Sequence, residues 1–310
     1  MARAWRAACA FALSLIAGCG APDVARDRLP RFAAPSGPPP RVALVLGSGG
    51  PRGFAHIGVL KALEDHGVKP DLVVGSSVGS MVGALYSAGM SAREMERLAY
   101  ELNILNFFEF GMIAYRPANG EPIQAYVNQL VKGRTIEQLP TAFAATATRL
   151  ADRKLVAFNR GDTGLAVRAS SASAPQFASV RVGDDMYTDS DDLSPVPIRA
   201  ARLLGAKVVI AVDVSAFAAD TPPGVPKEWI EKDARRAKQV ASEAGEADVL
   251  LHPNIGYYAG QNEAYRRRVI ATAEKYTLEK MPAILAAIAR AGTAPDQAAS
   301  ARSPAGDASR

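Results

Sequence analysis

Two short glycine-rich segments hold the residues of this chain that are best suited to chemistry. The segment Gly75-Ser76-Ser77-Val78-Gly79 has the G-x-S-x-G spacing of a nucleophile elbow, a strained strand-to-helix turn that holds a serine hydroxyl clear of its own backbone. The earlier segment Gly47-Ser48-Gly49-Gly50-Pro51-Arg52-Gly53 would aim bare backbone N–H groups at developing negative charge. Together they indicate a nucleophile and an oxyanion hole, which is the machinery of acyl transfer.

Each segment stands between an expected strand and an expected helix. Apolar runs at 42–46 and 72–74 suit buried strands, and the residues at 54–64 and 77–87 have helical periodicity. A capping box at Ser91-Ala92-Arg93-Glu94 opens another helix. We also expect strands at 142–149, 154–159, 207–213 and 248–251, and helices at 122–132, 162–171, 195–204, 227–244, 262–279 and 283–291. Strands buried on both faces and joined by helices predict a three-layer α/β/α fold with a mostly parallel central sheet.

The first 19 residues have the features of an export signal. Arg3 and Arg6 precede an apolar run at 7–16, which is too short to span a bilayer as a helix. Ile16-Ala17-Gly18-Cys19 then resembles the lipobox of bacterial lipoproteins, the alternative being an ordinary secretory signal with a chance cysteine. We expect cleavage before Cys19 and acylation of Cys19 by two or three chains, enough for a durable anchor. The protein would then be exported and held in the bacterial envelope, on the periplasmic side or in the outer membrane.

The remaining composition bounds the organisation of the chain. Residues 20–40 are rich in proline and predict a tether, 41–291 form one domain, and 292–310 lack large apolar residues and should be disordered. Cys9 would leave with the signal, so Cys19 would be the single cysteine of the mature chain, without a disulfide. The net charge of +5 would fall to +3, with 34 basic residues against 31 acidic ones.

Basic residues are dispersed along the chain, apart from Arg235-Arg236 and Arg266-Arg267-Arg268. We expect these two groups on solvated helix faces, because short basic runs of this kind are common on exposed helices. Without a concentrated basic surface we expect no nucleic-acid partner. The sequence does not identify a protein partner.

A third motif follows the two glycine segments. Asp189 stands at an expected strand end, and Pro195-Val196-Pro197 opens the next helix. The order of glycine-rich loop, G-x-S-x-G and aspartate segment resembles that of the patatin-like phospholipases. The resemblance covers about 41–291 and includes the stretches Arg52-Gly53-Phe54-Ala55-His56-Ile57-Gly58-Val59-Leu60 and 169–175.

The resemblance implies a role for each motif. Ser77 would be the nucleophile of a Ser-Asp dyad and Asp189 its base, while Ser76 is only its neighbour at the strand end. Backbone N–H groups of Gly49 and Gly50 would form the oxyanion hole, with Arg52 fixing that loop. The expected activity releases fatty acids from membrane phospholipids or lysophospholipids through an acyl-enzyme, with no cofactor and no metal.

The turn after Asp189 departs from the family pattern. The family usually has glycine and then glycine or alanine there, whereas this chain has Ser190 and Asp191. If the turn needs positive φ, Ser190 would be strained by about 1–3 kcal/mol. Asp191 and Asp192 would also favour the protonated form of Asp189. A catalytically weak lipid-binding lipoprotein is therefore one alternative function, and a general carboxylesterase or thioesterase is another.

Several residues outside these motifs have alternative interpretations. The aspartates between 184 and 192 could suggest a calcium loop, but they lack the spacing and the glycine of an EF-hand. His252 is the one candidate for a Ser-His-Asp triad of the conventional order. His56 is expected to be packed or hydrogen-bonded in its helix. The aromatic stretch at 103–115 could line an acyl pocket, form a lid, or be core under a loop.

Overall fold

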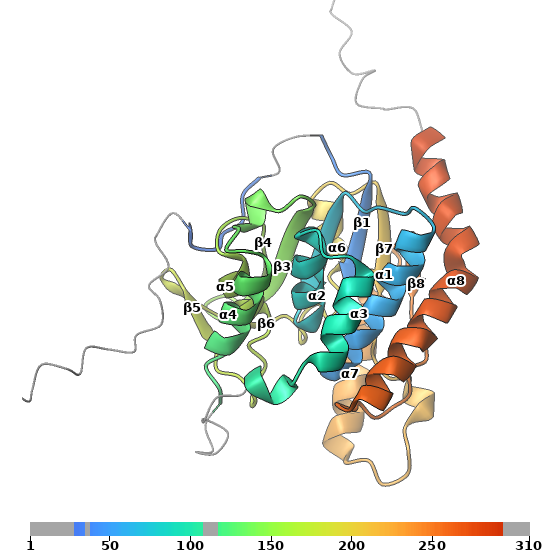
Figure 1. Cartoon of the computed structure of the whole chain (residues 1–310). Helices are drawn as coiled ribbons and strands as arrows, with labels where there is room; N and C mark the ends of the chain where they lie inside the picture. The colour runs from blue at the N-terminus through green and yellow to red at the C-terminus, as the bar shows by residue number, and fades with distance from the viewer. Residues whose placement is uncertain (1–27, 35–37, 108–116, 294–310) are drawn as a thin grey trace, which may run out of the picture.

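A computed structural model describes residues 28–34, 38–107 and 117–293 (Figure 1). One sheet organises them, in the order β5-β6-β3-β2-β1-β7-β8, with β4 also paired to β3. The run β3-β2-β1-β7-β8 is parallel, while β4, β5 and β6 are antiparallel additions. The strands are β1 Val42–Leu46, β2 Leu72–Ser76, β3 Ala142–Arg149, β4 Lys154–Phe158, β5 Val180–Val182, β6 Asp185–Asp189, β7 Val208–Val212 and β8 Val249–Leu251.

Helices cover both faces of this sheet, as Figure 1 shows. Side chains alternate along a strand, so Leu44 and Leu46 of β1 face the larger apolar core, while Ala43 and Val45 face the smaller one. Helices α1, α2 and α8 pack into the larger core, and α6 packs into the smaller one with Val240 of α7. The helices are α1 Ala55–Asp65, α2 Val78–Ser87, α3 Ala92–Glu101, α4 Glu121–Leu130, α5 Thr163–Ser170, α6 Ile198–Leu203, α7 Lys227–Ala244 and α8 Glu263–Thr293. The predicted three-layer fold with a mostly parallel sheet is confirmed.

The C-terminal helix differs from the prediction. Two helices, broken before Pro282, were expected, but α8 is continuous through that proline. Its buried side chains keep one helical face across the proline, so packing outweighs the lost backbone hydrogen bond. These buried residues are Val269, Ile270, Ala273, Thr277, Met281, Ile284 and Ala287. The strand β5, which pairs with β6, was not expected from the sequence.

Part of the expected tether is attached to the body. Arg31 N–H donates to the Arg160 carbonyl at 3.1 Å, and Asp162 N–H donates to the Arg28 carbonyl at 2.6 Å. Asn159 exchanges two hydrogen bonds of 2.7 Å with the backbone of Ala33. Residues 28–33 of the expected tether are therefore docked on the body of the protein. The expected signal peptide and the tail from 294 lie outside the described residues.

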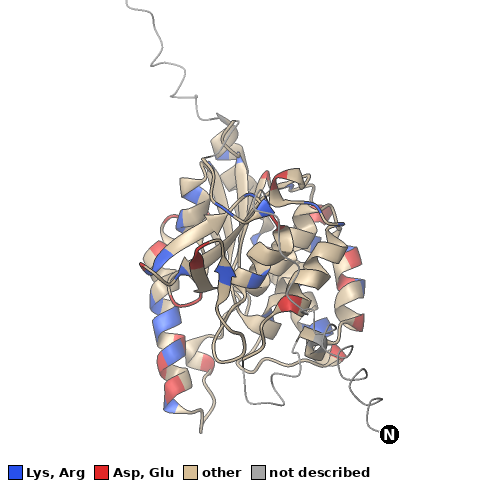
Figure 2. Ribbon diagram, turned by 90° about the vertical axis from the view of Figure 1, so that its left-hand side faces the viewer, with Lys and Arg blue, Asp and Glu red and all other residues tan. Residues whose placement is uncertain are grey.

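Charged residues are interspersed over several helices (Figure 2). Two of the basic residues expected on solvated faces are instead buried, Arg236 at 8% exposure and Arg266 at 6%. Arg266 donates to the carbonyls of Ala99 and Leu102, at 2.6 and 2.7 Å, and so ties α8 to the end of α3. Of the helices in the described part of the chain, none has the length and apolar content needed to cross a bilayer.

The aromatic stretch at 103–115 is described only in part. Phe107 is buried and meets the Tyr126 ring edge-on, with the ring centroids 5.2 Å apart. This residue therefore belongs to the core. Phe108, Phe110, Met112 and Ile113 lie outside the described residues.

Candidate active site

Ser77 stands at a sharp turn between β2 and α2. Its backbone has φ 53° and ψ −123°, and it caps the N-terminus of α2. Positive φ is costly for a residue with a side chain, and it is found where the surroundings enforce it. Here an added Cβ at Gly75 would meet the backbone of Ser80, and one at Gly79 would meet the Leu46 carbonyl. The glycines of the G-x-S-x-G segment let strand and helix close tightly around Ser77.

Ser76 and Ser77 have different surroundings. Ser76 is fully buried, and its hydroxyl hydrogen-bonds with that of Ser190 at 2.8 Å. Ser77 is half-buried, and its backbone N–H donates to Ser170 Oγ at 2.9 Å at the end of α5. Among these neighbours, Ser77 is the one with access to a substrate.

The glycine-rich loop lies beside this turn, at the end of β1. Gly47 N–H donates to the Val212 carbonyl at 3.0 Å, and Ser48 N–H donates to the Pro195 carbonyl at 2.8 Å. In contrast, no described residue accepts a hydrogen bond from the backbone N–H of Gly49 or Gly50. Two backbone donors are therefore left for a ligand at this loop.

Arg52 holds this loop in two ways. Its backbone N–H donates to the Gly49 carbonyl at 3.2 Å, which closes the turn from within. Its guanidinium donates to the carbonyl of Tyr257, in the loop that follows β8. Arg52 thus joins the glycine turn to a distant loop.

The sheet register brings Asp189 to the level of Ser77. Ser76 of β2 is paired with Thr146 of β3, and the next residue, Ala147, is paired with Asp189 of β6. Ser77 and Asp189 therefore flank β3 at the same height. The side chain of Ser77 lowers the pKa of Asp189, which is consistent with this proximity.

The Asp189 carboxyl is nevertheless a weak acid in this setting. Burial is the largest influence and, with the negative charge of Asp191, raises its pKa to about 7. Hydrogen bonding with Ser77, a hydrogen bond from the Asp191 N–H at 2.9 Å and the positive charge of Arg236 act in the opposite direction. A carboxylate with a pKa near neutrality is suited to take and return a proton at physiological pH.

Ser190 fits the turn after Asp189 without backbone strain. The described non-glycine residues with positive φ are Ser77, Lys132 and Arg153, so Ser190 has an ordinary backbone conformation. Its fully buried hydroxyl hydrogen-bonds with Ser76 and with Thr146, at 2.8 and 2.9 Å. The backbone strain expected for a serine in place of glycine is therefore absent at Ser190, and the serine makes hydrogen bonds that a glycine cannot make.

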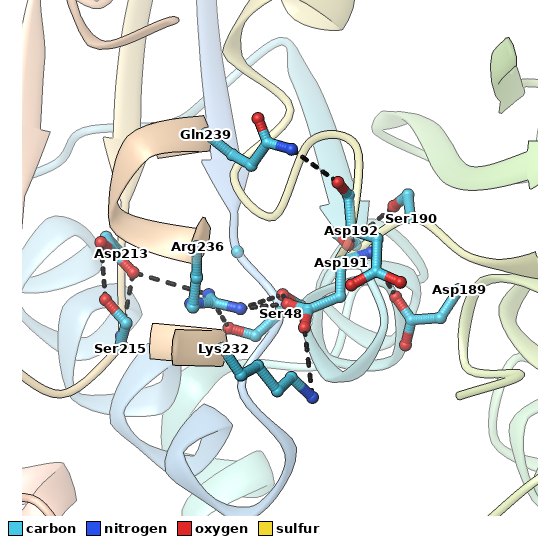
Figure 3. Close-up of polar contacts among 12 residues, drawn as sticks. Ser48, Asp189, Ser190, Asp191, Asp192, Asp213, Ser215, Lys232, Arg236 and Gln239 are labelled. Carbon is cyan, nitrogen blue, oxygen red and sulfur yellow. Dashed lines mark hydrogen bonds and ion pairs between the residues drawn. The ribbon is translucent and has the colours of Figure 1, made fainter. Parts of the chain in front are cut away.

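Asp191 belongs to a buried polar cluster that sequence reasoning missed. Its carboxylate accepts hydrogen bonds from Ser48 and Arg236 and lies 3.8 Å from Lys232 Nζ (Figure 3). The positive charges of Arg236 and Lys232 and the bond from Ser48 hold its pKa below the usual value, against the effect of burial. The buried residues of α7 are Arg236, Val240 and Glu243, which share one helical face. That spacing is the signal that could have revealed Arg236.

His56 and His252, the second of them the triad candidate, both bond to backbone carbonyls and not to Ser77. His56 is fully buried beside the Gly47 carbonyl, with Nε2 at 2.8 Å, and burial lowers its pKa to about 4. His252 lies 3.0 Å from the Ser215 carbonyl and stacks on Phe217. It follows β8, three strands from β2 and so about 14 Å away across the sheet. Neither histidine is in a position to form a triad with Ser77.

A pocket of about 310 Å³ adjoins the Asp191 cluster. Its lining consists of charged and amide side chains, which makes it unsuited to an acyl chain: Arg153, Asp191, Asp192, Lys232, Arg235, Arg236 and Gln239. Within the described ranges no three His, Cys, Asp or Glu side chains converge as metal ligands. Asp191, a member of the suspected calcium loop, is instead paired with Arg236.

Known proteins are similar in sequence to more than half of this chain. An uncharacterized NTE family protein of Mycobacterium tuberculosis is 36% identical over 203 residues, which are 63% of this chain and 56% of that protein. Human patatin-like phospholipase domain-containing protein 6 is 34% identical over 182 residues, 56% of this chain and 13% of that protein. Lysophospholipase NTE1 of Debaryomyces hansenii is 29% identical over 189 residues, 58% of this chain and 12% of that protein. The chain thus spans little more than half of the mycobacterial relative.

Solved structures support the fold. VipD from Legionella pneumophila superposes with a TM-score of 0.54 at 13% identity, over 84% of this chain and 70% of that one. Residues 44–202, which run from β1 through α6, match the description of the patatin-like phospholipase family. They include the glycine loop, Ser77 and Asp189. On this match the chain belongs to the patatin-like phospholipase family.

Proposed function

We propose that this protein is a serine acyl hydrolase that releases fatty acids from phospholipid or lysophospholipid esters. One observation carries the proposal: a half-buried serine at an elbow with positive φ lies level with a buried aspartate across β3, and the pKa of that aspartate is near 7. The free backbone donors of the glycine loop beside this pair supply the third component that acyl transfer requires.

The proposed reaction proceeds in two steps. Asp189 takes the proton of Ser77 Oγ as that oxygen attacks the ester carbonyl carbon. The N–H groups of Gly49 and Gly50 stabilise the resulting oxyanion, aided by the positive end of α2. Asp189 then returns the proton to the leaving alcohol as the ester bond breaks. A water molecule, deprotonated by the same carboxylate, then attacks the acyl carbon, and the proton passes to Ser77 Oγ as the bond to the fatty acid breaks.

The lipid substrate class rests on the family and on its members. The matched description is that of a phospholipase, and one relative is named a lysophospholipase. A fatty acyl ester with a phosphate-containing headgroup is therefore the substrate we propose. We further propose that acylated Cys19 places the enzyme on the membrane that holds this substrate, on the basis of the segment Ile16-Ala17-Gly18-Cys19.

A fluorophosphonate probe tests the proposal directly, since it labels an activated serine and not an inert one. The wild-type protein should be labelled and should hydrolyse lysophospholipid and p-nitrophenyl esters. Ser77→Ala should abolish both, whereas Ser76→Ala is the matched control and should keep a measurable fraction. Labelling of Ser76, or an unlabelled wild-type protein, would contradict the proposed function.

A further inference from the structure

Arg236 lies at the centre of the polar cluster between α7 and the glycine loop (Figure 3). One terminal nitrogen donates to Ser48 Oγ at 2.7 Å and to the Asp191 carboxylate. The other donates to the Ser48 carbonyl at 2.8 Å and lies 3.6 Å from an Asp213 oxygen. A single guanidinium therefore contacts the loop after β1, the turn after β6 and the residue after β7.

This cluster adjoins both halves of the proposed catalytic machinery. Ser48 stands next to Gly49, whose N–H is one proposed oxyanion donor. Asp191 donates its backbone N–H to Asp189 Oδ1 at 2.9 Å, and its carboxylate accepts a hydrogen bond from Ser48. The base and the oxyanion loop are thus connected through the side chains of Ser48 and Asp191, and Arg236 donates hydrogen bonds to both.

The burial of this cluster argues that it does more than stabilise the fold. Arg236 is 8% exposed, Asp213 2% and Ser48 1%. Removing charges from water is costly, and buried ion pairs often contribute little net stability compared with apolar residues of similar size. Their best-supported benefit is to fix one arrangement of the groups that they join.

We propose that Arg236 is a positioning residue that, through Asp191 and Ser48, holds the Asp189 turn and the Gly49–Gly50 loop in their catalytic arrangement. The inference rests on the proposed hydrolase function and deepens it. The contacts of Arg236 are with Ser48, Asp191 and Asp213 and not with Ser77, so its effect reaches the reaction through the residues it holds. Misplacement by a fraction of an ångström at either end would weaken proton transfer or oxyanion stabilisation.

Three single changes test this role at different points of the cluster: Ser48→Ala, Asp191→Asn and Arg236→Gln. Each should lower kcat for p-nitrophenyl ester hydrolysis by roughly tenfold or more while KM stays within about threefold, because transition-state contacts are lost and not substrate binding. Lys238→Gln is the matched control, since it removes a positive charge from an exposed position of the same helix. It should leave kcat within about twofold.

A double variant of Ser48 and Asp191 tests whether the two residues act together or separately. Ser48 and Asp191 are joined by one hydrogen bond, so Ser48→Ala combined with Asp191→Asn should cost little more than the larger single effect. Effects that simply multiply would show that the two residues act separately, and would overturn the proposal. Because the Ser48 variant removes only a hydroxyl, it remains informative if Arg236→Gln fails to fold.

The pH dependence of kcat/KM gives a signature that a purely structural role would not produce. The charges that act on the Asp189 carboxylate are those of Asp191, which raises its pKa, and Arg236, which lowers it. Asp191→Asn should therefore move the acidic limb to lower pH, and Arg236→Gln should move it to higher pH, each by at least about half a unit. Lys238→Gln should leave the limb in place.

The outcomes separate this inference from the function on which it rests. An active wild-type protein whose Ser48 and Asp191 variants behave like Lys238→Gln would refute the positioning role alone. A wild-type protein that neither hydrolyses esters nor reacts with the fluorophosphonate probe would refute both. Rescue of activity by Arg236→Lys to the wild-type level would also contradict the proposal, since an ammonium cannot reproduce the two-pronged contact with Ser48 and Asp191.

Discussion

The hydroxyl groups of Ser76 and Ser190 lie 2.8 Å apart, and they join the strand that leads into Ser77 to the turn that leaves Asp189. Both side chains are fully buried, and Thr146 of the intervening strand bonds to Ser190 as well. The two residues that precede and follow the proposed dyad are therefore fastened across β3. This contact fixes the separation of Ser77 and Asp189 independently of any substrate.

Replacing Ser190 with glycine should destabilise the protein, although the family usually has glycine there. The change removes the bonds to Ser76 and Thr146 and leaves buried hydroxyls without a partner, so the free energy of unfolding should fall by about 1–3 kcal/mol. Urea denaturation measures this loss, with Ser190→Ala as the comparison. A glycine variant more stable than the wild-type protein would show that the turn is strained after all.

Removal of the proposed base should leave the fold intact and stop the chemistry. Asp189→Asn keeps the side-chain shape but cannot accept the proton of Ser77, so the hydrolytic rate should fall by at least about 10². Steady-state kinetics with a p-nitrophenyl ester measures it, and Asp192→Asn serves as a control on an exposed neighbour. A mild effect of Asp189→Asn together with a severe effect of Asp192→Asn would reassign the base.

The same substitution should raise stability in a pH-dependent way. The folded-state pKa of Asp189, about 7, is above its ordinary value of 3.8. Between about pH 4 and 7 this carboxyl is ionised in the unfolded chain but still protonated in the folded one, so the free energy of unfolding falls as the pH rises. Asparagine escapes that penalty, so the Tm of Asp189→Asn should exceed that of the wild-type protein by a margin that grows up to pH 7 and then levels off. An equal Tm difference at pH 5 and pH 8 would contradict the raised pKa.

The activity of the wild-type protein should follow the ionisation of the same carboxyl. Only the charged form can accept a proton, so kcat/KM should rise about tenfold per pH unit below pH 7 and flatten above it. A pH profile with a soluble ester measures this limb. A flat profile between pH 5 and 8 would exclude Asp189 as the base.

The membrane anchor is tested by the N-terminus of the mature protein. Mass spectrometry should find Cys19 as the first residue and carrying acyl chains. Cys19→Ala should move the protein out of the membrane fraction, whereas Cys9→Ala, inside the expected signal, should not. An unmodified Cys19 in the mature chain would refute the anchor.

Local patterns were enough to predict most of the fold. The bounds of β1, β3 and α7 agree with the prediction, because continuous apolar runs and amphipathic periodicity reflect burial directly. The prediction failed where distant partners decide the structure. Helix α8 continues through Pro282 because its apolar face packs on the body of the protein, and Arg31 is held by Arg160. Neither partner is adjacent in the sequence.

In the site, too, local sequence patterns indicated some residues, whereas contacts between distant residues could not be predicted. Motif spacing and the family resemblance together singled out Ser77, Asp189 and the glycine loop, because each of them stands at the end of its own strand. The cluster around Arg236 could not be located in this way, because it joins residues 48, 191, 213 and 236, which only the fold brings together. A buried guanidinium is also hard to expect from composition, since arginine is seldom found inside.

The docking of residues 28–33 onto 159–162 limits the distance between an anchored Cys19 and the folded domain. From Cys19 to the attached Arg28 the backbone can span at most about 30 Å. The docked segment lies before the first turn of α5, and Ser77 meets the last turn at Ser170, about 12 Å further along. Were Cys19 acylated, the short segment from Cys19 to Arg28 would keep Ser77 close to the bilayer in which Cys19 is anchored. The enzyme would then search for esters in two dimensions, at a local concentration set by the lipid composition of its own membrane.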